Sequence, residues 1–151
     1  MEYKDVIMET RGLTFSYDGE QNILENLDFS VPEGKVTVLM GANGCGKSTL
    51  FKLMTKNLYP DEGAVILEGE DIDEMRLKDF AKKVAIVHQN NTAPPDLTVE
   101  RLVGYGRTPY LGAFQTAGGE EDAHAISWAM EVTNVKKYRN KSVSELSGGQ
   151  R

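Results

Sequence analysis

The sequence predicts an α/β fold, and three features of its order lead to this expectation. Runs with β-branched and aromatic residues alternate with turn signals over residues 6–35. A glycine-rich loop then separates an apolar run, residues 36–40, from a segment whose apolar residues recur at helical spacing. Later in the chain, strand-like and helical segments alternate again. An alternating order of this kind is typical of a sheet covered by helices.

The first part of the chain holds most of the expected strands. Strands are predicted at residues 6–17, 23–31 and 36–40, with the turn signals DGE and PEG between them. A helix is predicted after the glycine-rich loop, because apolar residues recur there at Leu50, Leu53, Met54 and Leu58. The next predicted elements are a turn and strand at 61–72, a short helix at 75–83 and a buried strand at 84–89.

The later part of the chain is predicted to be mainly helical. Residues 91–119 are rich in Pro, Gly and Thr, so they are interpreted as a connection rather than a core, with a short helix within 96–106. The clearest helix is residues 120–135, which carries acidic residues in its first turn. One face of it holds Ile126, Ala129, Met130 and Thr133.

Composition limits the class of protein. The 151 residues suit one domain, and 17 basic against 23 acidic residues give a net charge of −6, which argues against duplex DNA or an anionic membrane as the main partner. A single cysteine, Cys45, excludes an internal disulfide, and the first residues lack the pattern of a signal peptide. No apolar run approaches the roughly 20 residues that cross a bilayer. We therefore expect a cytosolic protein that reaches a membrane only through a partner.

The glycine-rich loop fits the pattern of a phosphate-binding loop. Gly41, Gly46, Lys47 and Ser48 have the spacing G-x-x-x-x-G-K-[ST], between a predicted strand and a predicted helix. Glycines allow backbone N–H groups to surround a polyphosphate, and the start of the helix adds positive potential. The lysine reaches the outer phosphates, and the serine hydroxyl binds Mg²⁺. A glycine-rich turn with a surface lysine is the alternative, and both flanks of the loop speak against it.

Two motifs together resemble one family. GANGCGKST at residues 41–49, followed by LSGGQ at residues 146–150, resembles the nucleotide-binding domain of ATP-binding cassette (ABC) proteins. The resemblance implies a phosphate-loop NTPase-type fold with an N-terminal antiparallel β subdomain, a RecA-like core and a partial α-helical subdomain. It also implies one incomplete ABC ATPase domain over residues 1–151. Within it, residues 1–90 are the β subdomain and phosphate-loop core, and residues 91–151 are the helical subdomain up to the signature motif.

The resemblance further implies a site for ATP and Mg²⁺. The residues expected to bind the cofactor are Tyr17, Gly41, Asn43, Gly44, Gly46, Lys47, Ser48, Thr49, Ser147, Gly148, Gly149 and Gln150. Catalytic roles are expected for Lys47 and Gln89, and Mg²⁺ contacts for Ser48 and Gln89. Tyr17 is expected to stack on adenine, with packing at a strand end as the alternative, whereas Phe15 is expected in the core. Ser147 is expected to cap a helix.

Three other residues receive no catalytic assignment. His88 is interpreted as a loop residue, and His124 as a solvated or satisfied residue. Cys45 lies beside Lys47 and a helix start, an environment that can make a thiol reactive. Redox control and simple filling of the loop by a small residue both remain open, with filling as the plainer interpretation.

Residues 103–112 point to a branch of the family. VGYGRTPYLG resembles the corresponding segment of ATPases that drive import of iron–siderophore complexes, haem or cobalamin. The resemblance implies a docking surface for a membrane subunit, with Tyr105, Arg107 and Tyr110 available to it, although its glycines could simply shape a loop.

The expected function is that of an ATP-binding and ATP-hydrolysing subunit of an ABC transporter that imports a metal chelate. Its implied partners are a second ABC ATPase subunit, most simply a second copy, transmembrane permease subunits and indirectly a substrate-binding protein, without nucleic acid. The resemblance also implies that the protein is a peripheral protein at the cytoplasmic face of the membrane.

The resemblance implies a helix, a carboxylate pair and a histidine beyond LSGGQ, none of which residues 1–151 contain. We therefore expect a truncated sequence that binds ATP but barely hydrolyses it. Two alternatives stay open, a soluble ABC ATPase without a transport role and a naturally short ATP-binding module without hydrolysis.

Overall fold

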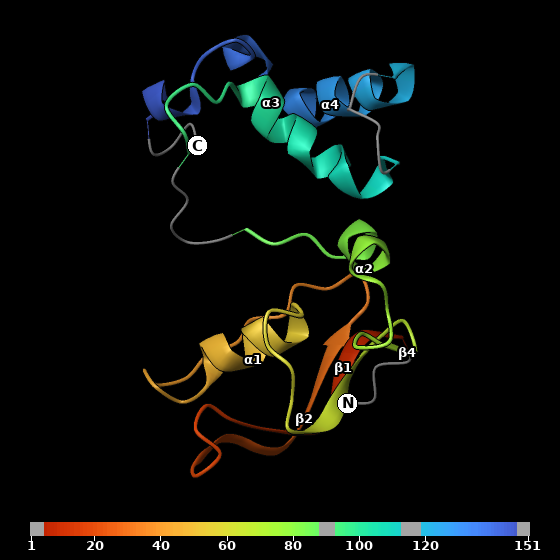
Figure 1. Cartoon of the computed structure of the whole chain (residues 1–151), viewed down its shortest axis with the longest axis vertical. Coiled ribbons are helices and arrows are strands. Elements are labelled where there is room, and N and C mark those ends of the chain that lie inside the picture. Colours follow the sequence, from red (N-terminus) through yellow and green to blue (C-terminus); the bar gives the residue numbers. More distant parts are fainter. Residues whose placement is uncertain (1–4, 88–92, 113–118, 148–151) are drawn as a thin grey trace. The chain divides into compact units, whose positions relative to one another are not determined.

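The computed structural model describes residues 5–87, 93–112 and 119–147 (Figure 1). The chain divides into two compact units, Met1–Val84 and Ala85–Arg151. Each unit has its own cluster of buried apolar side chains, so each is stabilised by contacts within itself.

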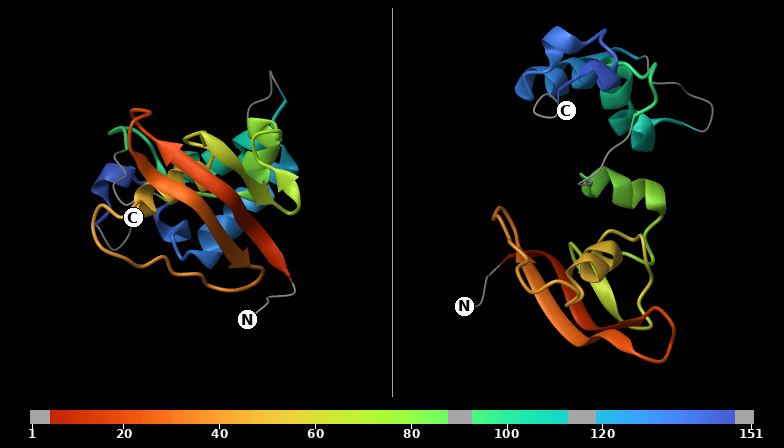
Figure 2. Two further views of the ribbon diagram at one scale, coloured as in Figure 1. Left: turned by 90° about the horizontal axis from the view of Figure 1, so that it is seen from below. Right: turned by 90° about the vertical axis from the view of Figure 1, so that its left-hand side faces the viewer.

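The first unit is built on an antiparallel sheet. Its strands are β1 Val6–Ser16, β2 Asn22–Pro32, β3 Glu62–Leu67 and β4 Glu70–Asp71. They lie in the order β2-β1-β3-β4. The two long strands β1 and β2 form a twisted ribbon (Figure 2), in which Phe15 pairs with Leu24. The predicted strand-rich, antiparallel beginning of the chain is therefore confirmed.

Two helices complete the core of this unit, α1 Lys47–Met54 and α2 Leu77–Lys83. Leu50 and Leu53, three residues apart on one face of α1, pack with Leu13 of β1 and Phe80 of α2. Leu13 and Leu53 are almost completely buried. Burial of one such leucine contributes about 1.5–3 kcal/mol, so α1 is held against the sheet mainly by these contacts.

A lysine stabilises the turn that leads into α2. Lys56 has a positive φ of 58°, and its ammonium group donates hydrogen bonds to the carbonyl oxygens of Met75, at 2.6 Å, and of Ile72. With a longer bond to the Asp73 carbonyl oxygen, at 3.5 Å, one charged group therefore binds three carbonyl oxygens of this turn.

The predicted strand at 36–40 is not formed, and the described part of the predicted strand at 84–89 is not a strand either. Residues 36–40 and 84–87 have no strand assignment, and Val36, Met40 and Val87 are 94%, 84% and 89% exposed. An apolar run forms a buried strand only when neighbouring strands accept its backbone hydrogen bonds. Within the ranges that the structure describes, no strand lies beside either run.

The second unit is helical. It contains α3 Val99–Gly104, α4 Glu120–Val132 and three short 3₁₀ turns, η1 Tyr105–Tyr110, η2 Lys136–Tyr138 and η3 Val143–Glu145. The Thr98 side chain caps α3 by accepting from the Arg101 amide. None of the helices in the described ranges has the length and apolar character required to cross a bilayer.

The interpretation of residues 91–119 as a connection is wrong for their first part. Leu97 and Val99 are 6% and 4% exposed and belong to the core of the second unit, with Met130 of α4. A backbone hydrogen bond of 2.8 Å from Val143 to Leu97 joins two segments that are distant in the sequence. The apolar pair is too short to show a period, which is why the sequence pattern conceals it.

Gly63 provides a test of the packing between β1 and β3. Its φ is +80°, and a Cβ placed on it would lie 2.4 Å from the carbonyl oxygens of Arg11 and Gly12. Gly63→Ala should lower the free energy of unfolding by about 2–4 kcal/mol, because backbone strain and a steric clash add together. Chemical denaturation measures this loss.

Gly69→Ala is the matched control for Gly63→Ala. Gly69 has a similar φ of +85°, but a Cβ placed on it would meet nothing within 4 Å. We expect the free energy of unfolding to fall by about 1–2 kcal/mol only, because this variant suffers backbone strain without a steric clash. Equal losses in the two variants would contradict the close contact at Gly63.

Candidate functional site

The glycine-rich loop is fixed by the sheet beside it. Gly46 has a φ of +88° and precedes the first residue of α1. A Cβ on Gly46 would lie 2.8 Å from Leu24 Cδ2 and 3.2 Å from the Ile23 carbonyl oxygen. Both the backbone conformation and the close approach to β2 therefore require glycine.

The beginning of α1 is an electropositive helix end. The first N–H groups of a helix have no partner within it and carry partial positive charge. No acidic residue lies in the first turn of α1, and no side chain caps Gly46. Polar groups on a ligand can therefore accept from these amides, as oxygens of a phosphate chain do in other proteins.

Lys47 lies back over its own loop. Its Nζ donates to the carbonyl oxygens of Gly41, at 2.7 Å, and of Ala42, at 2.5 Å, and lies 3.7 Å from Cys45 Sγ. The ammonium group is thereby held beside the loop amides. Cys45 is exposed, and a Cβ on Gly41 would meet its sulfur at 2.8 Å. The thiol thus occupies space within the loop, which agrees with the simpler interpretation, and redox control stays the untested alternative.

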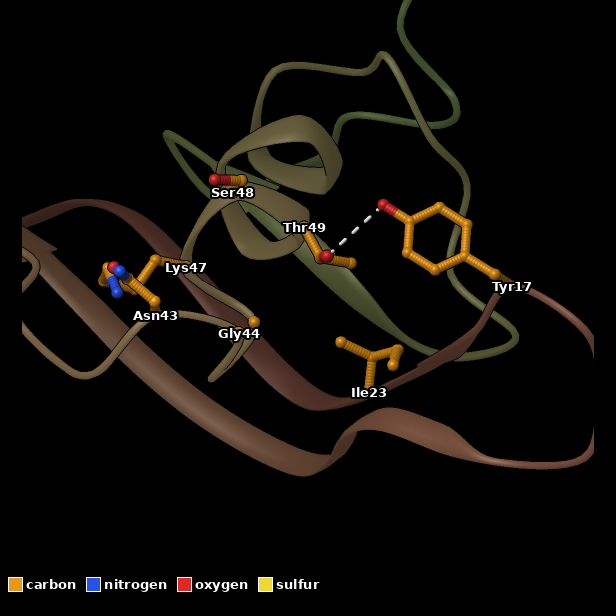
Figure 3. A pocket seen from close by; sticks show the side chains of 8 residues that line it. Tyr17, Ile23, Asn43, Gly44, Lys47, Ser48 and Thr49 are labelled. Atoms are coloured by element: carbon orange, nitrogen blue, oxygen red, sulfur yellow. Dashed lines mark hydrogen bonds between the residues drawn. The ribbon is translucent and has the colours of Figure 1, made fainter.

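Beside the loop lies a hollow of about 330 Å³. Its lining comes from the glycine-rich loop, the start of α1, β2 and the end of β1 (Figure 3). The lining residues are Tyr17, Ile23, Asn43, Gly44, Gly46, Lys47, Ser48 and Thr49. Every one of these except Ile23 is a residue that the sequence predicts for the site. Gly41 is not part of this lining, but its carbonyl oxygen positions Lys47.

Tyr17 forms one wall of the hollow. Its hydroxyl group is hydrogen-bonded to Thr49 Oγ1 at 3.3 Å (Figure 3). Its ring packs edge-on against Phe15, with 4.9 Å between centroids and 88° between planes. Tyr17 is 59% exposed and Phe15 only 7%. Phe15 is therefore a core residue, as predicted, and the exposed ring of Tyr17 can contact a ligand.

Ile23 is the residue that sequence reasoning missed. It stands at the start of β2, next to the buried Leu24, and is 38% exposed. Successive side chains of a strand point to opposite faces, so the core position of Leu24 turns Ile23 away from the core. The alternation of side chains along the strand is the sequence feature that could have placed Ile23 away from the core. It is a weak indication for a single apolar residue after a turn.

The turn after Tyr17 is held by a carboxylate. Asp18 Oδ1 accepts hydrogen bonds from the Glu20 amide at 2.9 Å, the Gln21 amide at 3.1 Å and the Ser16 hydroxyl at 2.9 Å. These bonds favour the ionised form, and they lower the pKa of Asp18 from 3.8 to about 2, with the Glu20 amide as the largest cause.

The residues present suit a nucleotide with Mg²⁺. Gly44 has open space around it, the loop supplies amides, and the exposed Ser48 stands in the first turn of α1. Magnesium keeps several waters and phosphate oxygens as ligands, so one or two protein oxygens suffice. In the described ranges, no group of three or more His, Cys, Asp or Glu side chains could hold a metal ion by itself.

Several predicted residues lie elsewhere or outside the described ranges. Gln89, His88, Gly148, Gly149 and Gln150 are outside them. Ser147 is exposed and directly follows Leu146, which is 7% exposed in the core of the second unit. The helix that Ser147 is expected to cap also lies outside the described ranges. His124 is exposed on α4, as predicted.

Arg107 is not available for docking, which corrects the expectation for residues 103–112. Its Nε donates to Asp122 Oδ1 at 2.6 Å, its Nη2 donates to Glu121 Oε1 at 3.1 Å, and its guanidinium lies 4.1 Å from the Tyr110 ring centroid. The side chain is only 15% exposed. Arg107 thus joins η1 to the acidic first turn of α4, whereas Tyr105 remains 56% exposed.

Comparison with known sequences identifies a family. The sequence profile of the ABC transporter family matches residues 24–151. The iron(3+)-hydroxamate import ATP-binding protein FhuC of Bacillus subtilis is 44% identical over 144 residues, which are 95% of this chain and 53% of FhuC. The ferric enterobactin transport ATP-binding protein FepC of Escherichia coli is 40% identical over 139 residues, 92% of this chain and 51% of FepC. The chain therefore spans about half the length of these relatives.

The fold has a counterpart among solved structures. CbiO1 from Clostridium perfringens, part of the ABC transporter complex CbiONQ, superposes with a TM-score of 0.79 at 25% identity. The match covers 97% of this chain and 58% of CbiO1. The predicted fold class, an α/β ABC-type domain with an antiparallel β part, is confirmed by this likeness. The predicted resemblance to ATP-binding proteins of iron-chelate importers is confirmed by the two relatives.

The low pKa of Asp18 can be measured directly. Because the folded-state pKa, about 2, is lower than the ordinary value of 3.8, the stabilisation by the carboxylate is fully present above about pH 4. It is lost as the pH falls towards 2. NMR titration of the Asp18 carboxyl carbon should give a midpoint near 2. A midpoint near 3.8 would contradict the hydrogen bonds of the turn.

Proposed function

The chain belongs to the ABC transporter family, and on this premise we propose that it forms the ATP-binding part of a subunit that energises import of a metal chelate. The observation that carries the proposal is the hollow beside the glycine-rich loop, which Tyr17, Ile23, loop residues, Lys47 and the hydroxyl-bearing Ser48 and Thr49 line. The import of iron chelates by relatives such as FhuC and FepC supports the choice of substrate class. The particular chelate is left open among iron–siderophore, haem and cobalamin.

ATP would lie with its base between Tyr17 and Ile23 and its phosphates along the loop. Both side chains line the hollow on the side away from Lys47 (Figure 3). A flat ring stacks on a base with favourable dispersion and little loss of entropy. The phosphates would replace the Gly41 and Ala42 carbonyls as partners of Lys47, and Ser48 would contact Mg²⁺.

Hydrolysis would need further groups. We assign to Gln89 a contact with the metal and the attacking water, and to Ser147, Gly148, Gly149 and Gln150 a contact with ATP on a second ABC ATPase subunit. Phosphoryl transfer depends on positioning and charge stabilisation. No residue of positions 1–151 is assigned as the carboxylate that activates water. We therefore propose binding with little turnover for these residues, and hydrolysis for a subunit of its relatives' length.

The proposed setting is the cytoplasmic face of a membrane, with permease subunits as direct partners and a substrate-binding protein as an indirect one. The exposed side chains of Tyr105 and Tyr110, 56% and 49% accessible, are the candidates for contact with the permease. The proposed division of the domain is residues 1–90 for the β subdomain and loop, and residues 91–151 for the helical part.

Lys47→Ala tests the phosphate site. Because a charge-assisted hydrogen bond contributes about 1.5–3 kcal/mol, the variant should bind Mg·ATP about 10- to 100-fold more weakly in isothermal titration calorimetry. In a subunit of full length, Mg²⁺-dependent hydrolysis should disappear.

Lys52→Ala is the control for Lys47→Ala, since Lys52 lies in the last turn of the same helix and does not line the hollow. It should bind ATP like the original chain. Normal affinity and turnover in Lys47→Ala would refute the site.

Tyr17 tests the base-binding half of the site. Tyr17→Ala should weaken ATP binding about 5- to 100-fold, because stacking on one base contributes about 1–3 kcal/mol. Tyr17→Phe loses only the 3.3 Å hydrogen bond to Thr49, so it should keep most of the affinity. If Tyr17→Phe were as weak as Tyr17→Ala, the hydroxyl group rather than the ring would be the contact.

The transport role needs a test in cells. Deletion of the gene should abolish uptake of one radiolabelled chelate among a ferric hydroxamate, a ferric catecholate, haem and cobalamin. The intact gene should restore uptake, and the Lys47→Ala gene should not. Unchanged uptake of all four would favour a soluble ABC ATPase without a transport role.

A further inference from the structure

The turn after Tyr17 is more strongly bonded than its exposure would suggest. We propose that Asp18 is a positioning residue for nucleotide binding, which holds the Tyr17 ring in place for the base without touching the nucleotide itself. This inference rests on the proposed function, because it assigns a role within the same ATP site.

The ring is already held from one side. Phe15, which is fixed in the core, packs edge-on against Tyr17, and Thr49 of α1 is hydrogen-bonded to its hydroxyl group. These contacts act on the side chain only. Because 59% of Tyr17 is exposed, these contacts alone define its orientation weakly, and the backbone turn that follows also contributes.

Asp18 and Ser16 fix that turn as a pair. Asp18 Oδ1 accepts from two amides further along the turn and from the Ser16 hydroxyl, and Ser16 Oγ in turn accepts from the Gly19 amide at 2.8 Å. Short polar side chains that bond the backbone beside them are the usual way to define a turn. The two residues that flank Tyr17 are therefore bonded to each other across it.

The turn is also tied to a distant part of the chain. The Ser16 amide donates to Asp61 Oδ2 at 2.7 Å, and the Asp61 amide donates to the Thr14 carbonyl oxygen at 3.0 Å. Asp61 directly precedes β3, so these two bonds tie the end of β1, where the turn begins, to the start of β3. None of Ser16, Asp18 and Asp61 lines the hollow. Ile23, which also lines it, is held within β2 by the pairing of β2 with β1. We therefore assign the effect of Asp18 on the base to the adjoining Tyr17.

Loss of this order would weaken binding of the base. A ring that is mobile in the free protein must be immobilised when the nucleotide binds, and one immobilised side chain corresponds to about two- to tenfold in affinity. The phosphates would contact the loop and the start of α1, which pack against Leu24 of β2 and the core of the first unit. Asp18 should therefore affect ligands that carry a base and spare those that lack one.

The test compares two ligands by calorimetry, Mg·ATP and inorganic tripolyphosphate with Mg²⁺. In Asp18→Ala, the Kd for ATP should rise about two- to tenfold relative to the Kd for tripolyphosphate. Removal of one negative charge favours both anions, and the more highly charged tripolyphosphate somewhat more. The difference in the ratio between Asp18→Ala and Asp18→Asn, which both lose this charge, therefore reports on the base. Asp18→Asn keeps an oxygen that accepts from the Glu20 and Gln21 amides. Its ratio of the two Kd values should therefore stay close to that of the original chain.

Two further variants separate positioning from general stability. Asp28→Ala removes a carboxylate that also accepts a backbone amide, that of Gly12 at 2.8 Å, but away from the hollow. It should leave the ratio unchanged. Gly19→Ala strains the same turn through its φ of +76°, with nothing within 4 Å of its Cβ position. It should lower the preference for ATP even if Asp18→Ala does not fold.

The outcomes are distinct. If the original chain binds neither ligand, the proposed function fails and the inference falls with it. If the original chain prefers ATP and the Asp18→Ala ratio is unchanged, or if both affinities fall equally, the inference alone is overturned. In Tyr17→Ala, the additional Asp18→Ala change should have no further effect on the ratio, because it acts through a ring that is no longer there.

Discussion

The close approach of Gly46 to strand β2 is the contact on which the rest of the site depends. A Cβ at this position would lie 2.8 Å from Leu24, so the loop can turn into α1 only where no side chain intervenes. Leu24 belongs to the same core as Leu50 and Leu53 of α1. One core therefore sets both the direction of the helix and the position of the loop. The start of α1 lines the hollow because its apolar residues are packed against the sheet.

Short local patterns predicted most of the first unit. The spacing of glycines, lysine and serine around Gly46 specifies both the bend of the loop and the chemistry of its groups, so those residues could be identified without a structure. The two long strands followed from alternating runs and turn signals, whereas their antiparallel arrangement was implied by the resemblance to the ABC family. By contrast, the runs at 36–40 and 84–89 have the composition of buried strands, but strand formation depends on a neighbour that no local pattern reports. In the described ranges no such neighbour lies beside them.

Residues whose role depends on distant partners were the ones that the sequence could not predict. In the sequence, Arg107 is a charged residue in a polar loop. In the structure it forms a half-buried ion pair with Asp122, fifteen positions later. Ile23 reads as an ordinary strand residue, and only the register of β1 with β2 brings it beside Tyr17. Leu97 and Val99 are likewise buried because they pack with Val143, a residue more than forty positions later. These contacts are tertiary, and their sequence separation leaves no periodic trace.

The bonds that Lys47 makes with its own loop bear on selectivity among anions. Because the ammonium group already has the Gly41 and Ala42 carbonyls as partners, an anion gains this charge only by displacing them. A lone orthophosphate has few additional contacts with which to offset that exchange, whereas a chain of phosphates also reaches the amides at the start of α1. If the loop binds phosphates as proposed, these bonds would favour a chain of phosphates over the abundant single phosphate of a cell.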